Sequence, residues 1–142
     1  MLSKSKFILG QQCKKSFWFD INNIEPTNPP DEGSLERLNA GNEVGDISKD
    51  LFPGGAEIPY LPGDQKKMFE LTKESISQGA TSIYEASFIF DDIFVRVDLM
   101  NKTEKGWDIY EVKSSTRIRS YHKYDASIQW HVLKELNLFQ IN

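Results

Sequence analysis

Cysteine and histidine are scarce in this sequence: there is a single cysteine, Cys13, and there are two histidines among 142 residues. One cysteine excludes a disulfide framework and any all-cysteine metal site within this chain. No apolar run approaches the roughly 18 residues that span a bilayer, and the basic start of the chain is not followed by the apolar stretch of a signal peptide. We therefore expect a cytoplasmic protein with no membrane partner.

An excess of charge of one sign is also absent. The chain has 17 basic and 21 acidic residues, which gives a formal net charge of −4. This balance carries no global signal for nucleic-acid binding, so any such function has to rest on the local placement of charge. Hydrophobic residues make up 39% and charged residues 27%, as is typical of a globular protein. The length suits one domain, over residues 1–142.

The first half of the chain predicts two helices. Residues 25–33 contain three prolines and a glycine, which favours a loop. Ser34 is the predicted N-cap of a helix that ends near residue 51, and Asp64 is the predicted N-cap of a second helix over 65–78. The apolar stripe of the first helix recurs at helical spacing: Leu35, Leu38, Val44, Ile47 and Leu51.

The second half predicts a sheet followed by a helix. Asp125 is the predicted N-cap of a helix over 126–136, and residues 138–142 look like the opening of another strand, as expected of an N-terminal fragment of a longer protein. The order of elements favours an α+β fold, with a mixed central sheet flanked by helices in an α/β/α arrangement. Three stretches are rich in β-branched and aromatic residues and predict a meander: 82–90, 93–100 and 107–115.

The predicted hairpin places two acids opposite each other. If Asp91 and Asp92 form the turn, the numbers of opposite residues sum to 183, so Glu85 faces Asp98 with Cβ atoms roughly 4.5–5.5 Å apart. Like charges in opposite positions destabilise a sheet. A divalent cation shared by the two carboxylates would remove this penalty.

The third predicted strand adds a glutamate and a lysine. The two-residue period of a strand puts Glu111 and Lys113 on one face, near Asp98. Carboxylate oxygens suit Mg²⁺ or Mn²⁺, and a lysine beside them can orient an attacking water. Metal-assisted phosphodiester hydrolysis needs these parts. The same residue types also occur on the solvated faces of surface strands, so this string is a weak signal by itself.

A wider set of residues resembles a known family. Residues 96–99 (Arg-Val-Asp-Leu), residues 109–115 (Ile-Tyr-Glu-Val-Lys-Ser-Ser) and Gln129 in a later helix are similar to the RecB-type branch of the PD-(D/E)XK nuclease superfamily. The similarity is greatest to RecB-like exonucleases associated with CRISPR loci and to related uncharacterised bacterial proteins that begin Leu-Ser-Lys-Ser-Lys, as residues 2–6 do here. It covers most of the chain.

This resemblance implies a fold, an activity and a site. The fold would be a restriction-endonuclease-like core, and the activity that of a Mg²⁺- or Mn²⁺-dependent deoxyribonuclease, such as an exonuclease acting on single-stranded DNA or on DNA ends. Asp98, Glu111 and the backbone carbonyl of Val112 would bind the metal. Lys113 would position the attacking water, and Gln129 would reach the scissile region from its helix.

Two positions depart from the family pattern. The RecB-type metal-binding histidine of the first helix is replaced by Gly45, and the Gln-x-x-x-Tyr motif that begins at Gln129 ends in Leu133. Glu43 or Glu85 is a candidate for a substituting metal-binding acid, although Glu43 can equally be a solvated helix residue. The departures keep open a catalytically inactive nuclease-like module that binds nucleic acid or a protein partner, and a general α+β interaction domain.

Local features bear on a cluster and on DNA. Some relatives bind an iron–sulfur cluster through one early and three late cysteines. Cys13 matches the early position, but an iron–sulfur cluster is not possible within this chain alone, and Cys13 by itself is interpreted as a small buried residue. Arg117, Arg119 and Lys123 follow the predicted metal site without an intervening acid. Such a strip suits a nucleic-acid backbone, and a solvated loop is the alternative.

Overall fold

The sheet is mixed, and β4 lies at its centre. The structure, a computed structural model, describes residues 1–24 and 32–138. The strand order is β1-β4-β3-β2, and β5 also pairs with β4. β1 runs parallel to β4 and β2 parallel to β3, whereas the β3–β4 and β4–β5 pairs are antiparallel. The strands are β1 (Leu2–Ser3), β2 (Ala56–Glu57), β3 (Ser82–Phe90), β4 (Ile93–Thr103) and β5 (Gly106–Tyr110).

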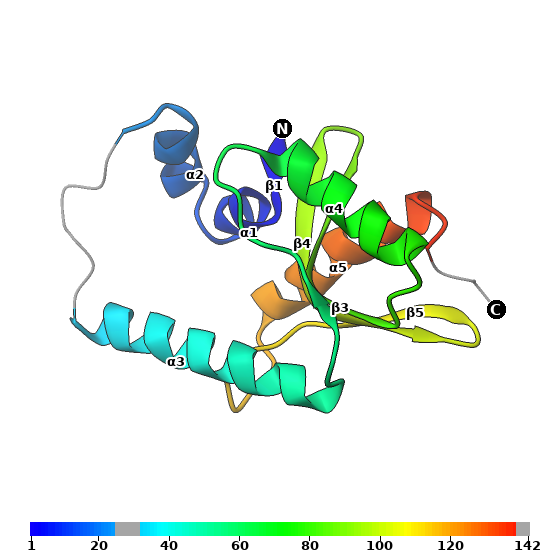
Figure 1. Cartoon of the computed structure of the whole chain (residues 1–142). Coiled ribbons are helices and arrows are strands. Elements are labelled where there is room, and N and C mark those ends of the chain that lie inside the picture. The colour runs from blue at the N-terminus through cyan, green and yellow to red at the C-terminus, as the bar shows by residue number, and fades with distance from the viewer. Residues whose placement is uncertain (25–31, 139–142) are drawn as a thin grey trace.

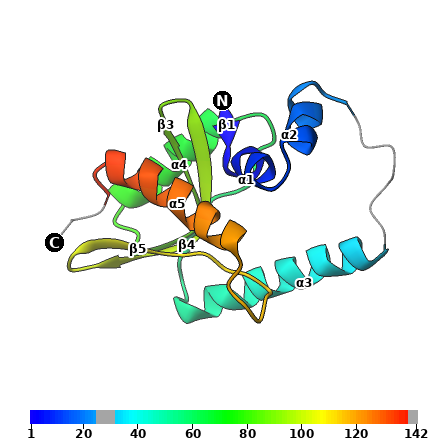
Figure 2. The same ribbon diagram turned by 180° about the vertical axis from the view of Figure 1, so that it is seen from behind.

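Helices cover both faces of this sheet. α4 lies against one face and α5 against the other, together with α1, as the two opposite views show (Figures 1 and 2). α3 runs below the sheet in Figure 1. The predicted α+β fold, with a mixed sheet flanked by helices, is therefore confirmed. The helices are α1 (Lys4–Gln12), α2 (Lys14–Ile21), α3 (Glu32–Ser48), the 3₁₀ helix η1 (Lys49–Leu51), α4 (Gln65–Ser77) and α5 (Ser120–Glu135).

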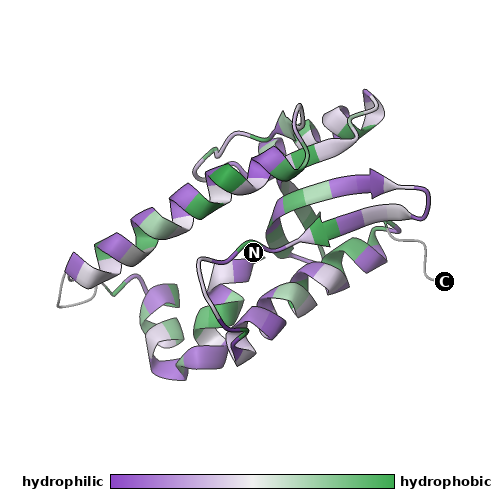
Figure 3. Cartoon of the chain, turned by 90° about the horizontal axis from the view of Figure 1, so that it is seen from below, coloured by the Kyte–Doolittle hydropathy of each residue, from purple (hydrophilic) through white to green (hydrophobic). Residues whose placement is uncertain are grey.

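The core lies between the sheet and these helices. Because both faces of β3 and β4 are covered, their side chains are buried on either side rather than in simple alternation. Figure 3 shows apolar and polar residues interleaved along the helices around it. Within the described stretches, no helix has both the length and the apolar content to cross a membrane. The largest fully buried side chains include Met68, Ile83, Phe88, Val95, Val97, Met100, Val132 and Leu133.

Two predicted elements form as the sequence indicates. Asp91 and Asp92 both adopt positive φ, 46° and 59°, as a two-residue turn between twisted strands requires, and Phe88 faces Val95 in the predicted register. α4 begins where Asp64 accepts a hydrogen bond from the Lys67 N–H at 3.0 Å. The end of β5 and the start of α5 differ from the prediction.

The third strand ends earlier than predicted, and the last helix begins earlier. β5 stops at Tyr110 rather than at residue 115, because the Val112 N–H donates to the Asp98 carboxylate at 2.8 Å instead of to a carbonyl of β4. α5 begins at Ser120, where the Arg119 N–H donates to Nδ1 of His122 at 3.2 Å. Asp125 is therefore a buried residue inside the helix and not its N-cap.

The helix α3 also differs from prediction. It begins at Glu32, so Ser34 lies inside it and is not its N-cap, and residues 32 and 33 belong to the helix rather than to the predicted loop. Its predicted apolar stripe faces outward: Leu38 and Ile47 are both 61% exposed. Residues 25–31 of the predicted loop, and residues 139–142 of the predicted last strand, lie outside the described residues.

A tyrosine fixes the chain between η1 and β2. The Tyr84 hydroxyl donates to the carbonyl groups of Lys49 and Phe52 and accepts from the Gly55 N–H at 3.1 Å. A Cβ atom at Gly55 would lie only 2.6 Å from the Tyr84 ring, so this close approach requires glycine. The contact ties the end of α3 to β3 beside the candidate site.

Candidate functional site

The topology brings two chain segments to Asp98. β1 and β5 pair with the same edge of β4, the edge that β3 leaves free, and they do so at opposite ends. β1 reaches Phe94 and runs toward the middle of β4, whereas β5 runs in the opposite direction and ends at Leu99. Lys4 is the first residue after β1, and Glu111 is the first residue after β5. Both therefore arrive beside Asp98.

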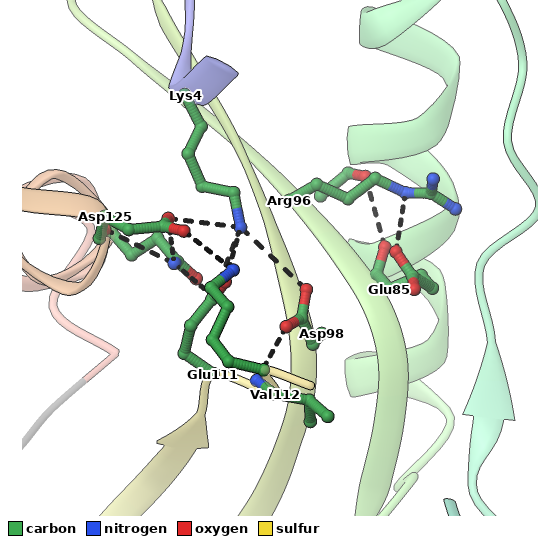
Figure 4. Close-up of polar contacts among 10 residues, drawn as sticks. Lys4, Glu85, Arg96, Asp98, Glu111, Val112 and Asp125 are labelled. Atoms are coloured by element: carbon green, nitrogen blue, oxygen red, sulfur yellow. Dashed lines mark hydrogen bonds and ion pairs between the residues drawn. The ribbon is translucent and has the colours of Figure 1, made fainter. Parts of the chain in front are cut away.

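The ammonium of Lys4 lies among three carboxylates (Figure 4). Its Nζ atom is 3.2 Å from Oε2 of Glu111, 3.3 Å from Oδ1 of Asp125 and 3.9 Å from Oδ1 of Asp98. The Lys4 side chain is only 16% exposed. Four separate elements of the chain thus contribute to one charged cluster.

Lys113 and Gln129 complete this cluster. The Lys113 ammonium forms ion pairs with Glu111 and with Oδ2 of Asp125, the latter at 3.0 Å. Nε2 of Gln129 donates to Oε2 of Glu111 at 2.6 Å and to Oδ1 of Asp125 at 2.9 Å. Gln129 is 1% exposed, and its Oε1 atom is buried without a hydrogen-bond partner in the described residues. The glutamine therefore orients both acids, and its Oε1 atom remains an acceptor that no described residue uses.

Asp98 positions the segment that follows β5. One of its oxygens accepts from the Val112 N–H at 2.8 Å, and the other faces Lys4. A charge-assisted hydrogen bond of this kind is shorter and stronger than a neutral one. It holds the Glu111-Val112-Lys113 segment outside the strand, so that Glu111 and Lys113 both reach the cluster.

The cluster shifts the pKa values of Glu111 and Asp125 in opposite directions. Burial raises the pKa of the Glu111 carboxyl, with a further contribution from Asp98 and opposition from Lys4. Burial acts in the same direction on Asp125, but Lys4 and the hydrogen bonds of Glu111 and Lys113 outweigh it and lower the pKa of Asp125. Burial alone would lower the pKa of Lys113, but its contacts with Glu111 and Asp125 raise that pKa above the usual range. Lys113 is therefore a firmly protonated ammonium group.

Glu85 does not join the cluster as predicted. Its neighbours pair with β4 in the predicted register, but Glu85 itself has φ 58° and interrupts the ladder opposite Asp98. Its carboxylate instead forms an ion pair with Nε of Arg96 at 3.2 Å, and burial raises its pKa. Figure 4 shows the pair directed away from the Lys4 cluster. Glu85 and Asp98 thus have different cationic partners in this structure, Arg96 and Lys4.

Glu43 is also placed away from the carboxylates. It is exposed on α3, and it does not line the cavity of about 210 Å³ that separates α3 from the cluster. The α3 residues that line this cavity are Gly41, Asn42, Gly45 and Ser48. The part of α3 that faces this cavity therefore carries small residues, two of them glycines.

The predicted basic strip borders the cluster. An open cleft of about 770 Å³ is lined by Arg119 together with Lys4 and Lys113. A neighbouring cavity of about 420 Å³ is lined by Arg117 and Lys123 together with Lys113. The cluster thus opens onto a surface with several cationic side chains, as a polyanionic ligand would require.

Cys13 is exposed, and the prediction that it is a small buried residue is wrong. It lies at the junction of α1 and α2, where its Sγ atom accepts a hydrogen bond from the Ser16 N–H at 3.5 Å. The hydrogen bond from Ser16 lowers the pKa of the thiol. Its place in the fold is that of a helix N-cap.

Two members of the cluster, Lys4 and Asp125, were not predicted as site residues. Asp125 precedes Gln129 by four residues, so the two share one helical face, and this spacing could have identified it once the helix start was known. Lys4 carried a weaker signal. Only the pairing of β1 with β4 shows that Lys4, which directly follows β1, enters the site.

The donor groups suit a hard divalent cation. Within the described residues, no three acidic, histidine or cysteine side chains form a preformed metal site by themselves. At least one oxygen each of Asp98, Glu111 and Asp125 nevertheless lies within 3.9 Å of one cationic atom, Nζ of Lys4. Carboxylate oxygens around one point are the ligands that Mg²⁺ and Mn²⁺ prefer. The Lys4 ammonium marks where the charges of these three carboxylates converge.

Comparison of the chain with protein-family models, with curated proteins and with solved structures gave no match.

Proposed function

We propose that this protein is a metal-dependent nuclease that hydrolyses DNA phosphodiester bonds, and that its α+β fold is a restriction-endonuclease-like core. One observation carries the proposal. Asp98, Glu111, Lys113 and Gln129, which the sequence resemblance singles out together, come from three different elements and meet in one cluster. A set of unrelated surface residues would not be expected to converge in this way.

The residues that would hold the metal are Asp98, Glu111 and the backbone carbonyl of Val112, and Asp125 is close enough to join them. A bound Mg²⁺ or Mn²⁺ supplies a Lewis acid that clamps the phosphate and lowers the pKa of water. The Val112 N–H fixes one oxygen of Asp98, so the other oxygen is left to face the cation position.

The remaining residues have separate roles in the proposed reaction. Because its pKa is raised, Lys113 acts as a positive group that orients water and stabilises phosphate charge, not as a general base. Gln129 holds the Glu111 carboxylate in place through a 2.6 Å hydrogen bond. Arg117, Arg119 and Lys123 line cavities that adjoin the cluster, where they would contact the DNA backbone without reading its sequence.

Mn²⁺ binding and DNA degradation test this proposal. We expect calorimetry to detect Mn²⁺ binding to the wild type and at least about tenfold weaker binding to Asp98→Asn, since a charged ligand is lost. Degradation of labelled single-stranded DNA should depend on Mg²⁺ or Mn²⁺ and be lost in Lys113→Met. Lys102→Met, at a surface position on β4, is the matched control. Metal-independent degradation, or equal activity of both lysine variants, would contradict the proposal.

A second candidate is an inactive nuclease-like module that binds nucleic acid or a protein partner. Gly45 favours it, because it leaves the α3 side of the cluster without a metal-binding side chain. In this case the wild type and Lys113→Met would bind single-stranded DNA with no degradation in the presence of either metal. The same assay therefore separates the two functions.

A further inference from the structure

Lys4 has an unusual place for a lysine near the start of a chain. β1 pairs Ser3 with Phe94 of β4, and the Ser3 side chain then accepts a hydrogen bond from the Lys6 N–H at 3.2 Å as the N-cap of α1. The backbone of Lys4 is thus held between a strand and a helix cap. Its side chain is aimed into the cluster instead of into solvent (Figure 4).

The ammonium uses the carboxylate oxygens that a metal ion would need. Nζ of Lys4 lies 3.2 Å and 3.4 Å from the two oxygens of Glu111. Oδ1 of Asp98, the oxygen that does not bind the Val112 N–H, lies 3.9 Å from the same atom. A cation bound by Glu111 and Asp98 would therefore lie next to a like charge, and such a pair repels strongly in a partly buried site.

The cluster has one more carboxylate than it has ammonium groups. Three carboxylates are met by the two ammonium groups of Lys4 and Lys113. Lys113 contacts Glu111 and Asp125, but only Lys4 lies near Asp98 among the ion pairs of the described residues. Loss of the Lys4 charge would leave Asp98 with the Val112 N–H alone, and it would make the cluster more attractive to a divalent cation.

We infer that Lys4 is a tethered counter-ion that competes with the divalent cation for Asp98, Glu111 and Asp125. It holds the three carboxylates together when no metal is bound, and it withdraws when the metal enters. The open cleft that Lys4 lines together with Lys113 and Arg119 has room for the displaced ammonium. This inference rests on the proposed function, because it takes the metal site proposed above as given. Lys4 is a positioning residue that sets the affinity for the metal.

Calorimetric titration with MnCl₂ tests the competition. Lys4→Met keeps the length and apolar character of the side chain but removes its charge, and it should bind Mn²⁺ about tenfold more tightly than the wild type. Lys4→Arg keeps the charge and should bind within about threefold of the wild type. Lys6→Gln is the matched control on the same helix, because Lys6 pairs with Asp20 at the surface. It should bind Mn²⁺ as the wild type does.

Thermal unfolding gives a second readout. Without metal, Lys4→Met should unfold at a lower temperature than the wild type, because the carboxylates lose a counter-charge. Added Mn²⁺ should then raise its unfolding temperature more than that of the wild type, since tighter ligands stabilise more. A purely structural lysine would lower stability and weaken metal binding together, whereas competition lowers stability and strengthens binding. Lys4→Gln repeats the test if Lys4→Met does not fold.

The outcomes separate this inference from the proposed function. If the wild type binds Mn²⁺ and Lys4→Met binds it equally or more weakly, the competition is refuted and the metal site stands. If neither protein binds Mn²⁺, both the metal site and the competition are refuted. Binding to Lys4→Met alone would support both, with the lysine as the group that keeps the wild-type site closed to metal.

Discussion

The helices α5 and α3 both border the cluster, but they do so in different ways. α5 packs Ile128, Val132 and Leu133 into the core, and the same face presents Asp125 and Gln129 to the site. α3 faces the cavity beside the cluster with small residues and leaves Leu38 and Ile47 exposed. The comparison shows that apolar spacing can predict a helix correctly and still not indicate which face is buried. The packing partner decides that.

The largest expected effect contrasts one leucine from each helix. Leu133→Ala should lower the free energy of unfolding by about 2–5 kcal/mol, because Leu133 is fully buried and its truncation leaves a cavity. Leu38→Ala in α3 should change it by less than about 0.5 kcal/mol, since that side chain is 61% exposed. Urea unfolding measures both. A loss above 2 kcal/mol for Leu38→Ala would show that the apolar stripe of α3 is buried after all.

A smaller effect contrasts two aspartates. Asp125→Asn removes a carboxylate that contacts Lys4, Lys113 and Gln129, and it should lower the free energy of unfolding by about 1–3 kcal/mol. Asp46 in α3 pairs with Lys49 at 3.1 Å, but its side chain is 77% exposed.

Asp46→Asn is the control for this pair of substitutions. Its effect should stay below about 1 kcal/mol, because exposed ion pairs contribute little. Urea unfolding in 0.1 M and 0.5 M salt measures both variants. Equal losses would show that the cluster around Asp125 is no better shielded from solvent than a surface ion pair.

The smallest change in stability is expected for Gly45. A Cβ atom at this position meets nothing within 4 Å, so Gly45→His should fold and gain a few tenths of a kcal/mol from its better helix propensity. The imidazole would enter the cavity beside Asp98 and should tighten Mn²⁺ binding. Gly45→Ala is the control, with a somewhat larger gain in stability of about 1 kcal/mol and unchanged binding. Equal Mn²⁺ affinity in both variants would show that α3 does not border the metal position.

The sequence predicted those parts of the fold that depend on local signals. The hairpin register follows from the Asp91-Asp92 turn, and the start of α4 follows from Asp64. The predicted start of α5 was wrong because an aspartate near a helix start resembles an N-cap. Asp125 is instead held inside the helix by contacts with residues distant in sequence, among them Lys4.

The candidate site was predicted only in part for the same reason. Glu111, Lys113 and Gln129 converge with Asp98 in the structure as the resemblance implied. The cross-strand partner Glu85 was assigned from register alone, but register gives no information on a left-handed backbone or on the ion pair with Arg96. No local pattern predicts where a two-residue strand pairs, and it is this pairing that brings the first helix to the site.

A crystal structure with Mn²⁺, recorded at a wavelength where manganese scatters anomalously, would show directly whether a metal displaces Lys4 from the cluster. We expect one anomalous peak among the carboxylate oxygens of Asp98 and Glu111 and the carbonyl of Val112, with the Lys4 ammonium displaced from its present position. A fully loaded crystal with no peak there, or with Lys4 still between the carboxylates, would contradict this expectation.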